Sequence, residues 1–195
     1  MASKRKDEIL KTALDLFNEN GASEVTTNHI AKAMQISPGN LYYYFGSKEA
    51  IIAAILEQMV EAWNPIYEID VSQSFGLEGL EASIRHSFQL IWRYRFFYRE
   101  VPLLLSRDPE LKERYFAIRD QRLEQQVAFA RRLAAAGALQ LPEEDSEVRQ
   151  IFTIAWLIAD SWLAYQELEN VQIDEAIESG VQLTITLYRP YLGSQ

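Results

Sequence analysis

The sequence predicts an all-α protein with about nine helices. Apolar side chains recur at intervals of three and four residues along the chain, which is the period of one helix face. Runs of alternating apolar and polar residues, which mark half-buried strands, are absent. With 195 residues the chain is long enough to bury a sizeable core, and it contains no repeat and no low-complexity linker.

The first helix is expected over about residues 4–20. Ala13, Leu16 and Phe17 lie on its apolar side, at spacings of three and four. Gly21 follows its last residue, at the position where glycine commonly terminates a helix. This segment therefore predicts an amphipathic helix that packs on the elements after it.

Two short helices joined by a tight turn come next. The hydroxyl of Thr26 or Thr27 can accept a hydrogen bond from an unpaired N–H of the first turn, so either residue is suited to the N-cap. The turn is made by Gln35–Ile36. Ser37 caps the second helix, and Pro38 occupies its first position, where a missing N–H costs nothing.

The second short helix has one buried side and one side unsuited to a core. Leu41 and Phe45, four residues apart, form the buried side. The three neighbouring tyrosines, Tyr42–Tyr44, cannot all face inward. Asn40 is of a type that reads adenine in the major groove, and Gly39 lets the backbone approach another molecule. The alternative is a helical subdomain without a DNA role, in which the tyrosines are half-buried.

These features predict a helix-turn-helix, in which the first helix crosses the DNA backbone and the second enters the groove. Ser47 caps the following helix and places Lys48 in its first turn. Capped helix N-termini favour phosphate oxygens because of their N–H groups and their dipole. The predicted DNA-binding residues are Thr26, Thr27, Ser37, Pro38, Gly39, Asn40, Tyr42, Tyr43, Tyr44 and Lys48.

This segment resembles the DNA-binding domain of the TetR family of bacterial repressors, over about the first 60 residues. The matching residues are Ala13, Leu16, Phe17, Gly21, Thr26, Ile30, Ala31, the run Ser37–Phe45 and Ser47–Lys48–Glu49. The resemblance implies that Tyr43 and Lys48 touch phosphates and that Tyr42 lies at the groove edge. The family often has lysine at position 38 and histidine at position 44, so Pro38 and Tyr44 bear on the operator sequence rather than on binding.

The charge distribution is compatible with this interpretation. The net charge is −9, but residues 1–60 carry 6 basic and 7 acidic residues, whereas residues 61–195 carry 13 and 21. Phosphate binding depends on the local field rather than on the charge of the whole chain. The basic run Lys4–Arg5–Lys6 has two interpretations: a solvated terminal run, or an arm over the minor groove or backbone.

Composition excludes several other classes of protein. The chain has no cysteine and two histidines, His29 and His86, so we expect no disulfide, no metal site and no cofactor. No nucleophile–base arrangement is evident, which argues against an enzyme. No apolar run is long enough to cross a bilayer and the basic start lacks the apolar core of a signal peptide, so we expect a cytoplasmic protein without a membrane partner.

Prolines and turn formers are expected to separate the remaining helices. The fourth helix covers about residues 47–63 and ends before Pro65, and a loop follows around Ser72–Gly76. The fifth runs from Leu77 to Glu100 and is broken by Pro102. Two helices are expected next: one begins near Asp108–Pro109, and the one after it continues to Gly137. A further helix is expected from the acidic residues 143–145 to about Asn170, and the last from about Asp174 to Arg189.

The last two predicted helices are too apolar for a solvated pair. One face can close the core of the domain, while the other needs a partner, which predicts a two-fold four-helix interface with Gly180 allowing close approach. In the resembling family these two helices make the dimer. The candidate interface residues are Ile158, Trp162, Ile177, Val181, Ile185 and Tyr188. The alternative is a fully internal core in a monomer.

An aromatic-rich set of residues in the second half of the chain suggests a small-molecule cavity. The candidates are Phe88, Trp92, Phe96, Phe116, Phe152, Trp156 and Asp160, with Phe129 in the same aromatic set. Ordinary core is the alternative for each aromatic residue. Asp160 interrupts an apolar run, so it attracts a cationic ligand, pairs with Arg93 or Arg95, or lies at the dimer seam. The arginines of the fifth helix equally permit an anionic or acyl ligand.

The sequence thus predicts a helix-turn-helix DNA-binding domain at residues 1–50 and a ligand-binding and dimerisation domain at residues 51–195. The predicted function is that of a ligand-responsive homodimeric regulator. It would bind a palindromic operator in double-stranded DNA and be released by a small-molecule effector. The alternative is an all-helical small-molecule-binding protein whose helix-turn-helix is vestigial.

Overall fold

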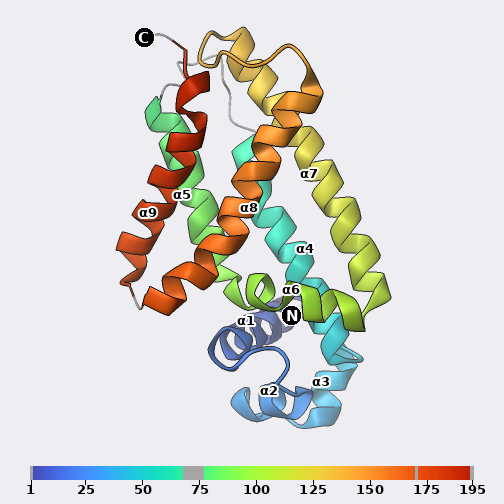
Figure 1. Cartoon of the computed structure of the whole chain (residues 1–195). Coiled ribbons are helices and arrows are strands. Elements are labelled where there is room, and N and C mark those ends of the chain that lie inside the picture. The colour runs from blue at the N-terminus through green and yellow to red at the C-terminus, as the bar shows by residue number, and fades with distance from the viewer. Residues whose placement is uncertain (1, 68–76, 170, 194–195) are drawn as a thin grey trace. The chain divides into compact units, whose positions relative to one another are not determined.

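The computed structural model describes residues 2–67, 77–169 and 171–193, and within them the chain is all-α (Figure 1). The helices are α1 (Ala2–Asn20), α2 (Thr27–Ala33), α3 (Pro38–Tyr44), α4 (Lys48–Tyr67), α5 (Leu77–Arg93), α6 (Arg95–Arg107), α7 (Pro109–Ala135), α8 (Asp145–Glu169) and α9 (Ile173–Tyr188), followed by a 3-10 turn, η1 (Arg189–Tyr191). The predicted fold class is confirmed. The loop predicted around Ser72–Gly76 lies outside the described residues.

The chain forms two compact units that are not consecutive in sequence. The N-terminal unit comprises Met1–Ala62 and Tyr94–Arg114, and the C-terminal unit comprises Trp63–Arg93 and Tyr115–Gln195. The first unit therefore contains α6 as well as the helix-turn-helix. The boundary expected between residues 50 and 51 concerns the DNA-binding module alone and stays a prediction.

In the N-terminal unit, α6 packs on α1 through aromatic and polar contacts. The rings of Phe17 and Phe96 lie 5.1 Å apart, and both side chains are fully buried. The side-chain oxygen of Asn18 accepts a hydrogen bond from the backbone N–H of Phe96 at 3.0 Å. Since the first N–H groups of a helix have no partner within it, Asn18 acts as an N-cap supplied by another helix.

This contact explains a wrong prediction. The helix expected over residues 77–100 is two helices, because the chain turns at Tyr94, directly before the N-terminus that Asn18 caps. Pro102 lies inside α6, and Pro65 lies inside α4 rather than after it. Both prolines are exposed, so water can replace the backbone hydrogen bond that each removes.

A second correction concerns the segment after α6. The helices predicted to begin near residue 108 and to continue to residue 137 are one continuous helix, α7. Gly137 follows it with a φ of +81°, the left-handed conformation that glycine adopts readily at a helix end.

In the C-terminal unit, α9 packs against both α5 and α8 (Figure 1). A Cβ atom at Gly180 would lie 2.6 Å from the ring of Phe88, so glycine is required where α9 crosses α5. The ring of Phe88 also meets Trp162 of α8 at 4.8 Å. The indole N–H of Trp162 donates to the carbonyl of Ala176 at 3.0 Å, which ties α8 to α9. The close approach at Gly180 was predicted for an interface between two copies, whereas here it occurs within one chain.

Across the described part of the chain, no helix is both long and apolar enough to traverse a lipid bilayer.

Candidate functional site

The helix-turn-helix begins with a reciprocal cap on α2. The hydroxyl of Thr26 accepts from the backbone N–H of His29 at 3.3 Å, and Nδ1 of His29 accepts from the backbone N–H of Thr26 at 3.3 Å. Two N–H groups that the helix leaves unpaired are thereby satisfied. Of the two expected cap residues, Thr26 is the N-cap.

The turn between α2 and α3 is closed by backbone hydrogen bonds. The N–H of Gln35 donates to the carbonyl of Lys32 at 3.1 Å, and the N–H of Ile36 donates to Ala31 at 3.0 Å. Gln35 has a φ of +56°, a left-handed conformation that costs a residue with a side chain roughly 1–2 kcal/mol. The turn predicted at Gln35–Ile36 is confirmed, and a non-glycine residue holds it in this conformation.

The cap on α3 orients the helix that is predicted to enter the groove. The hydroxyl of Ser37 accepts from the N–H of Asn40 at 3.2 Å, and Pro38 is the first helical residue, as expected. Leu41 and Phe45 are buried, at 0% and 8% exposed. The opposite side, from Ser37 to Asn40 with Tyr42 and Tyr43, is exposed.

The tyrosines of α3 differ in how they are held. The hydroxyls of Tyr42 and Thr27 lie 3.3 Å apart, within hydrogen-bond distance, so α2 positions the end of Tyr42. Tyr43 is 82% exposed and its ring meets that of the half-buried Tyr44 edge to face at 5.1 Å. A rigid ring that carries a hydroxyl into solvent is suited to a DNA phosphate.

Gly39 is exposed and has space around it. A Cβ atom placed on it would meet nothing within 4 Å, and its φ is not positive. The fold of the single chain therefore does not require a glycine at this position. A molecule outside the chain that approaches the backbone closely would explain it.

Lys48 has an internal role beside its predicted one. Its ammonium donates a hydrogen bond to the carbonyl of Ala22 at 2.6 Å, which ties the start of α4 to the loop after α1. Lys48 is half-buried, and an ammonium has three donors, so this bond leaves two for phosphate oxygens. The hydroxyl of Ser47 accepts from the N–H of Ala50 at 3.1 Å, as its predicted capping role requires.

The basic residues near the N-terminus belong to α1 rather than to an extended arm. Arg5 pairs with Glu8 at 2.8 Å, and the ammonium of Lys6 lies 5.8 Å from the centre of the Phe45 ring. Lys4 and Lys6 are exposed in the first turns of this helix. Their charge therefore sits on the N-terminal unit as a helical surface.

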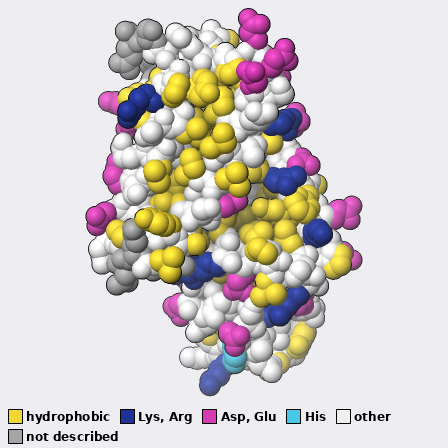
Figure 2. Space-filling model, viewed as in Figure 1, with side chains coloured by type: hydrophobic (Ala, Val, Ile, Leu, Met, Phe, Trp, Pro, Cys, Tyr) yellow, Lys and Arg dark blue, Asp and Glu magenta, His cyan; other side chains and the backbone are white. Residues whose placement is uncertain are grey.

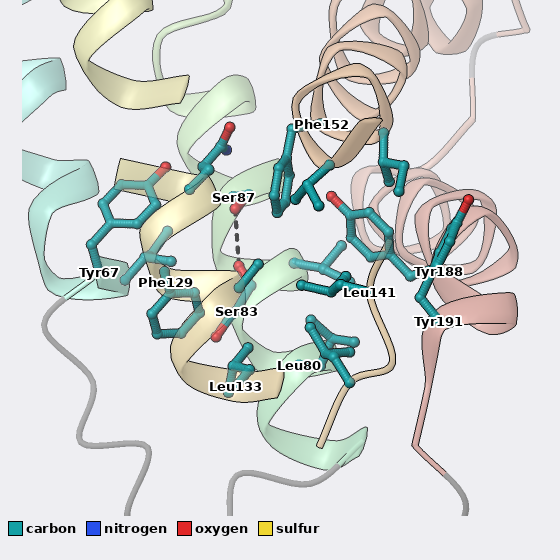
Figure 3. A pocket seen from close by; sticks show the side chains of 17 residues that line it. Tyr67, Leu80, Ser83, Ser87, Phe129, Leu133, Leu141, Phe152, Tyr188 and Tyr191 are labelled. Atoms are coloured by element: carbon teal, nitrogen blue, oxygen red, sulfur yellow. Dashed lines mark hydrogen bonds between the residues drawn. The ribbon is translucent and has the colours of Figure 1, made fainter. Parts of the chain in front are cut away.

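The C-terminal unit contains a cavity of about 110 Å³ (Figure 3). Five helices contribute to it: the end of α4, α5, α7, α8 and the end of α9, together with the α7–α8 connection and η1. In Figure 3, Tyr67 and Phe129 lie on one side of the space and Phe152 and Tyr188 on the other. Burial raises the pKa of Tyr67 and also that of Tyr188, so both phenols stay protonated at neutral pH.

Comparison with known proteins assigns the family. Residues 9–55 match the family model described as bacterial regulatory proteins, tetR family, and residues 58–195 match the model described as bacterial transcriptional repressor. The chain belongs to the TetR family. It is therefore a DNA-binding transcriptional regulator, of a family that is not enzymatic.

Individual relatives support this assignment. A TetR-family regulator from Marinobacter aquaeolei VT8 has 33% sequence identity and a TM-score of 0.84, over 96% of this chain and 90% of that one. The ketosteroid transcriptional regulator KstR2 of Mycobacterium tuberculosis has a TM-score of 0.67 at 20% identity, over 97% and 96%, and shares the fold.

Two relatives described as HTH-type transcriptional regulators match over shorter segments. RutR of Escherichia coli K12 is 41% identical over 61 residues, which is 31% of this chain and 29% of RutR. QacR of Staphylococcus aureus Mu50 is 43% identical over 58 residues, 30% of this chain and 31% of QacR. The matches span less than a third of either relative.

The residues predicted for a ligand site are dispersed in this TetR-family chain. Phe152 lines the cavity, as does Phe129 of the same aromatic set. Phe88 packs beneath Gly180, and Phe96 belongs to the N-terminal unit, against Phe17. Three other candidates are half-buried outside the cavity lining, namely Trp92, Phe116 and Trp156.

Asp160 also lies outside the cavity lining. It is an exposed residue of α8 in the single chain, yet the neighbouring protein groups that displace water from its carboxyl raise its pKa to about 6. Burial, and then the charge of Asp160, raises the pKa of the Tyr115 hydroxyl on α7. Asp160 is therefore a poorly solvated carboxylate at the surface of the C-terminal unit.

Most of the predicted dimer residues are internal. Ile177, Val181 and Ile185 are at most 7% exposed, because α9 packs against α5 and α8. Trp162 of α8 is 3% exposed, because it packs on Phe88 and bonds α9. Ile158 and Tyr188 are half-buried, and Tyr188 lines the cavity. In this conformation the four buried residues belong to the core of the C-terminal unit and offer little surface to a partner.

A different set of apolar residues on the same two helices is exposed. They are Ile154 (46%), Leu157 (61%), Tyr165 (60%) and Leu168 (86%) on α8, and Leu183 (51%) on α9, called here the α8–α9 stripe. The α8 members are spaced by three, eight and three residues, which keeps them on one helix face. Figure 2 shows apolar side chains gathered over α8 and towards α9.

Two polar residues that contact the loop after α1 or line the cavity were not predicted from the sequence. Glu100, on α6, accepts hydrogen bonds from Ala22 and Ser23 in the loop after α1. Gln126, on α7, lines the cavity with a buried side-chain oxygen. Both are polar residues in ordinary amphipathic helices, and neither stands in a local pattern that distinguishes it from a solvated residue.

Proposed function

We propose that this TetR-family regulator is a homodimeric repressor. It binds a palindromic operator through α3 and is released when a small molecule occupies the cavity of the C-terminal unit. The observation that carries the DNA-binding part is the exposed surface of α3, where Gly39, Asn40, Tyr42 and Tyr43 are held by capped helices yet make no core. Such a surface combines groups for phosphates with one for base edges.

The α8–α9 stripe supports the dimer. Several large apolar side chains exposed along one face of two neighbouring helices are typical of an interaction site. Since one patch on each copy suffices to build a two-fold interface, the stripe is suited to pairing with itself. A two-fold dimer matches a palindromic operator, whose half-sites lie about 34–36 Å apart.

Chain connectivity offers a route from the cavity to DNA. Leu80, Ser83, Ile84 and Ser87 of α5 line the cavity, and a single residue, Tyr94, separates the end of α5 from α6. In turn, α6 is bonded to α1 and the loop after it by Asn18 and Glu100. A ligand that shifts α5 would therefore act on an element fastened to the DNA-binding helices, and a tenfold loss of affinity needs about 1.4 kcal/mol of coupling.

DNA binding is tested with the full chain and the DNA upstream of its own coding sequence. Fluorescence anisotropy should show salt-dependent, sequence-specific binding. Asn40→Ala should reduce discrimination between operator variants more than overall affinity, because Asn40 is placed to read a base. Asn28→Ala, on the exposed surface of α2, is the matched control for loss of an exposed amide.

Two results would overturn the proposal. The first is a folded wild-type protein that binds every sequence equally or none, which would favour the alternative of a small-molecule-binding protein with a vestigial helix-turn-helix. The second is a monomer by sedimentation equilibrium in the operator complex. Operator binding by a dimer, weakened by a ligand of the cavity, is the expected result.

A further inference from the structure

We infer that the effector is a neutral, mainly apolar molecule of about one six-membered ring, which donates a hydrogen bond to Oε1 of Gln126. The inference rests on the proposed function in taking the cavity of the C-terminal unit as the effector site. It is carried by the chemistry of the lining, by one unpaired buried oxygen and by the volume of the cavity.

The lining excludes a charged ligand. The described side chains around the cavity include no Lys, Arg, Asp or Glu, and most of them are aliphatic or aromatic. A charged group that leaves water for such surroundings loses its hydration without gaining a counter-charge. The cationic and anionic effectors considered from Asp160 and the arginines therefore meet no counter-charge among the side chains that line this space.

Both serine hydroxyls of the cavity lining are already paired. The hydroxyl of Ser83 donates to the carbonyl of Gly79 at 2.9 Å, and that of Ser87 donates to the carbonyl of Ser83 at 2.9 Å, the bond drawn in Figure 3. These contacts tie the two hydroxyls to the backbone of α5.

The lining also contains a buried acceptor that is unpaired, Oε1 of Gln126. This oxygen is buried and has no hydrogen-bond partner among the residues that the structure describes. Buried polar atoms are nearly always paired, and an unpaired acceptor destabilises the fold unless something satisfies it. A hydroxyl or N–H group of a ligand would do so, and the apolar lining would hold the rest of that molecule.

The volume sets the size of the ligand. The cavity measures about 110 Å³. An apolar cavity of about 150 Å³ in another protein accepts benzene, so a single ring is near the limit without rearrangement. Phenol and toluene are a matched pair of this size, in which a hydroxyl replaces a methyl group.

The test compares these two compounds by calorimetry on the full-length protein. Phenol should bind, and benzoate and benzylammonium should not. The decisive quantity is the ratio of phenol affinity to toluene affinity, compared between variants. The hydration of the two compounds is the same in every titration, so it cancels in this comparison. In Gln126→Met, which removes the acceptor and nearly keeps the shape, this ratio should fall about tenfold. Gln121→Met, at an exposed position of the same helix, is the control and should leave the ratio unchanged.

Several results would overturn the inference. They are an unchanged ratio in Gln126→Met, equal binding of benzoate, and no binding of phenol to a folded protein that still binds its operator. Thermal unfolding of both variants checks the fold, and Gln126→Met should be at least as stable as the wild type. If phenol binds with the expected ratio but leaves the operator complex intact, the ligand class stands and release by this ligand is what fails.

Discussion

The carboxylate of Glu100 on α6 accepts two hydrogen bonds from Ser23, one from its backbone N–H at 3.1 Å and one from its hydroxyl at 2.8 Å. The same carboxylate accepts from the N–H of Ala22 at 2.7 Å. Residues 77 positions apart are thus joined by charge-assisted bonds, which are stronger than bonds between neutral groups. The next residues along the chain from Ser23 lead directly into the cap of α2.

We expect Glu100→Gln to loosen this connection. An amide keeps one acceptor but loses the charge and turns an N–H group towards the donors of Ala22 and Ser23. The free energy of unfolding should fall by about 1–3 kcal/mol. Urea unfolding measures the loss, and Glu113→Gln, at an exposed position of α7, should change stability little. Equal stability of both variants would mean that the Glu100 contacts do not hold the loop.

Lys48→Ala separates two roles of this lysine. If the ammonium contacts a phosphate, affinity should fall for every DNA sequence alike, and the slope of log affinity against log salt should decrease in magnitude by about one. If its bond to the Ala22 carbonyl is its main contribution, stability should fall while the salt slope stays as in the wild type. We expect the reduced slope, and binding titrations at four salt concentrations decide between the two.

Gly39→Ala tests whether the backbone of α3 approaches DNA closely. The chain itself has room for the added methyl group, and alanine favours a helix, so the protein should be as stable as the wild type or more stable by up to about 1 kcal/mol. Affinity for the operator should nevertheless fall. A variant with unchanged affinity would show that this position does not face the nucleic acid at close range.

The α8–α9 stripe makes a prediction about assembly. Leu157→Glu places a charge in the proposed interface without touching the core, so it should yield a folded monomer with weak operator binding. Leu77→Glu, a charge at an exposed leucine outside the stripe, should remain dimeric. Sedimentation velocity with circular dichroism measures both properties. A dimeric Leu157→Glu protein would place the interface elsewhere.

Asp160 predicts a pH dependence of stability. Its pKa in the folded chain, about 6, lies above the ordinary value of 3.8, so the folded state holds this proton to higher pH than the unfolded state. The free energy of unfolding should therefore fall as the pH rises from about 4 to about 6. The residue is exposed in the single chain, and solvent screening should keep the effect small. Asp160→Asn should flatten this part of the profile in urea unfolding, whereas an identical slope would assign it to other groups.

What the sequence determined by itself is the local structure of the DNA-binding segment. The caps at Thr26, Ser37 and Ser47 and the turn at Gln35–Ile36 were predicted correctly. Each depends on hydrogen bonds between residues at most five positions apart, and residue type decides such bonds almost independently of the rest of the chain.

Only the tertiary structure decided where the later helices break and which of their faces are covered. The break at Tyr94 accompanies a cap from Asn18, and the inward orientation of Val181 and Ile185 follows from the packing of α9 on α5 at Gly180. A helical period identifies an apolar face but not its partner, because packing partners are brought together from distant parts of the chain. For the same reason, aromatic composition suggested a cavity, yet only the packing of α4, α5, α7, α8 and α9 showed where the cavity lies and that Gln126 lines it with an unpaired oxygen.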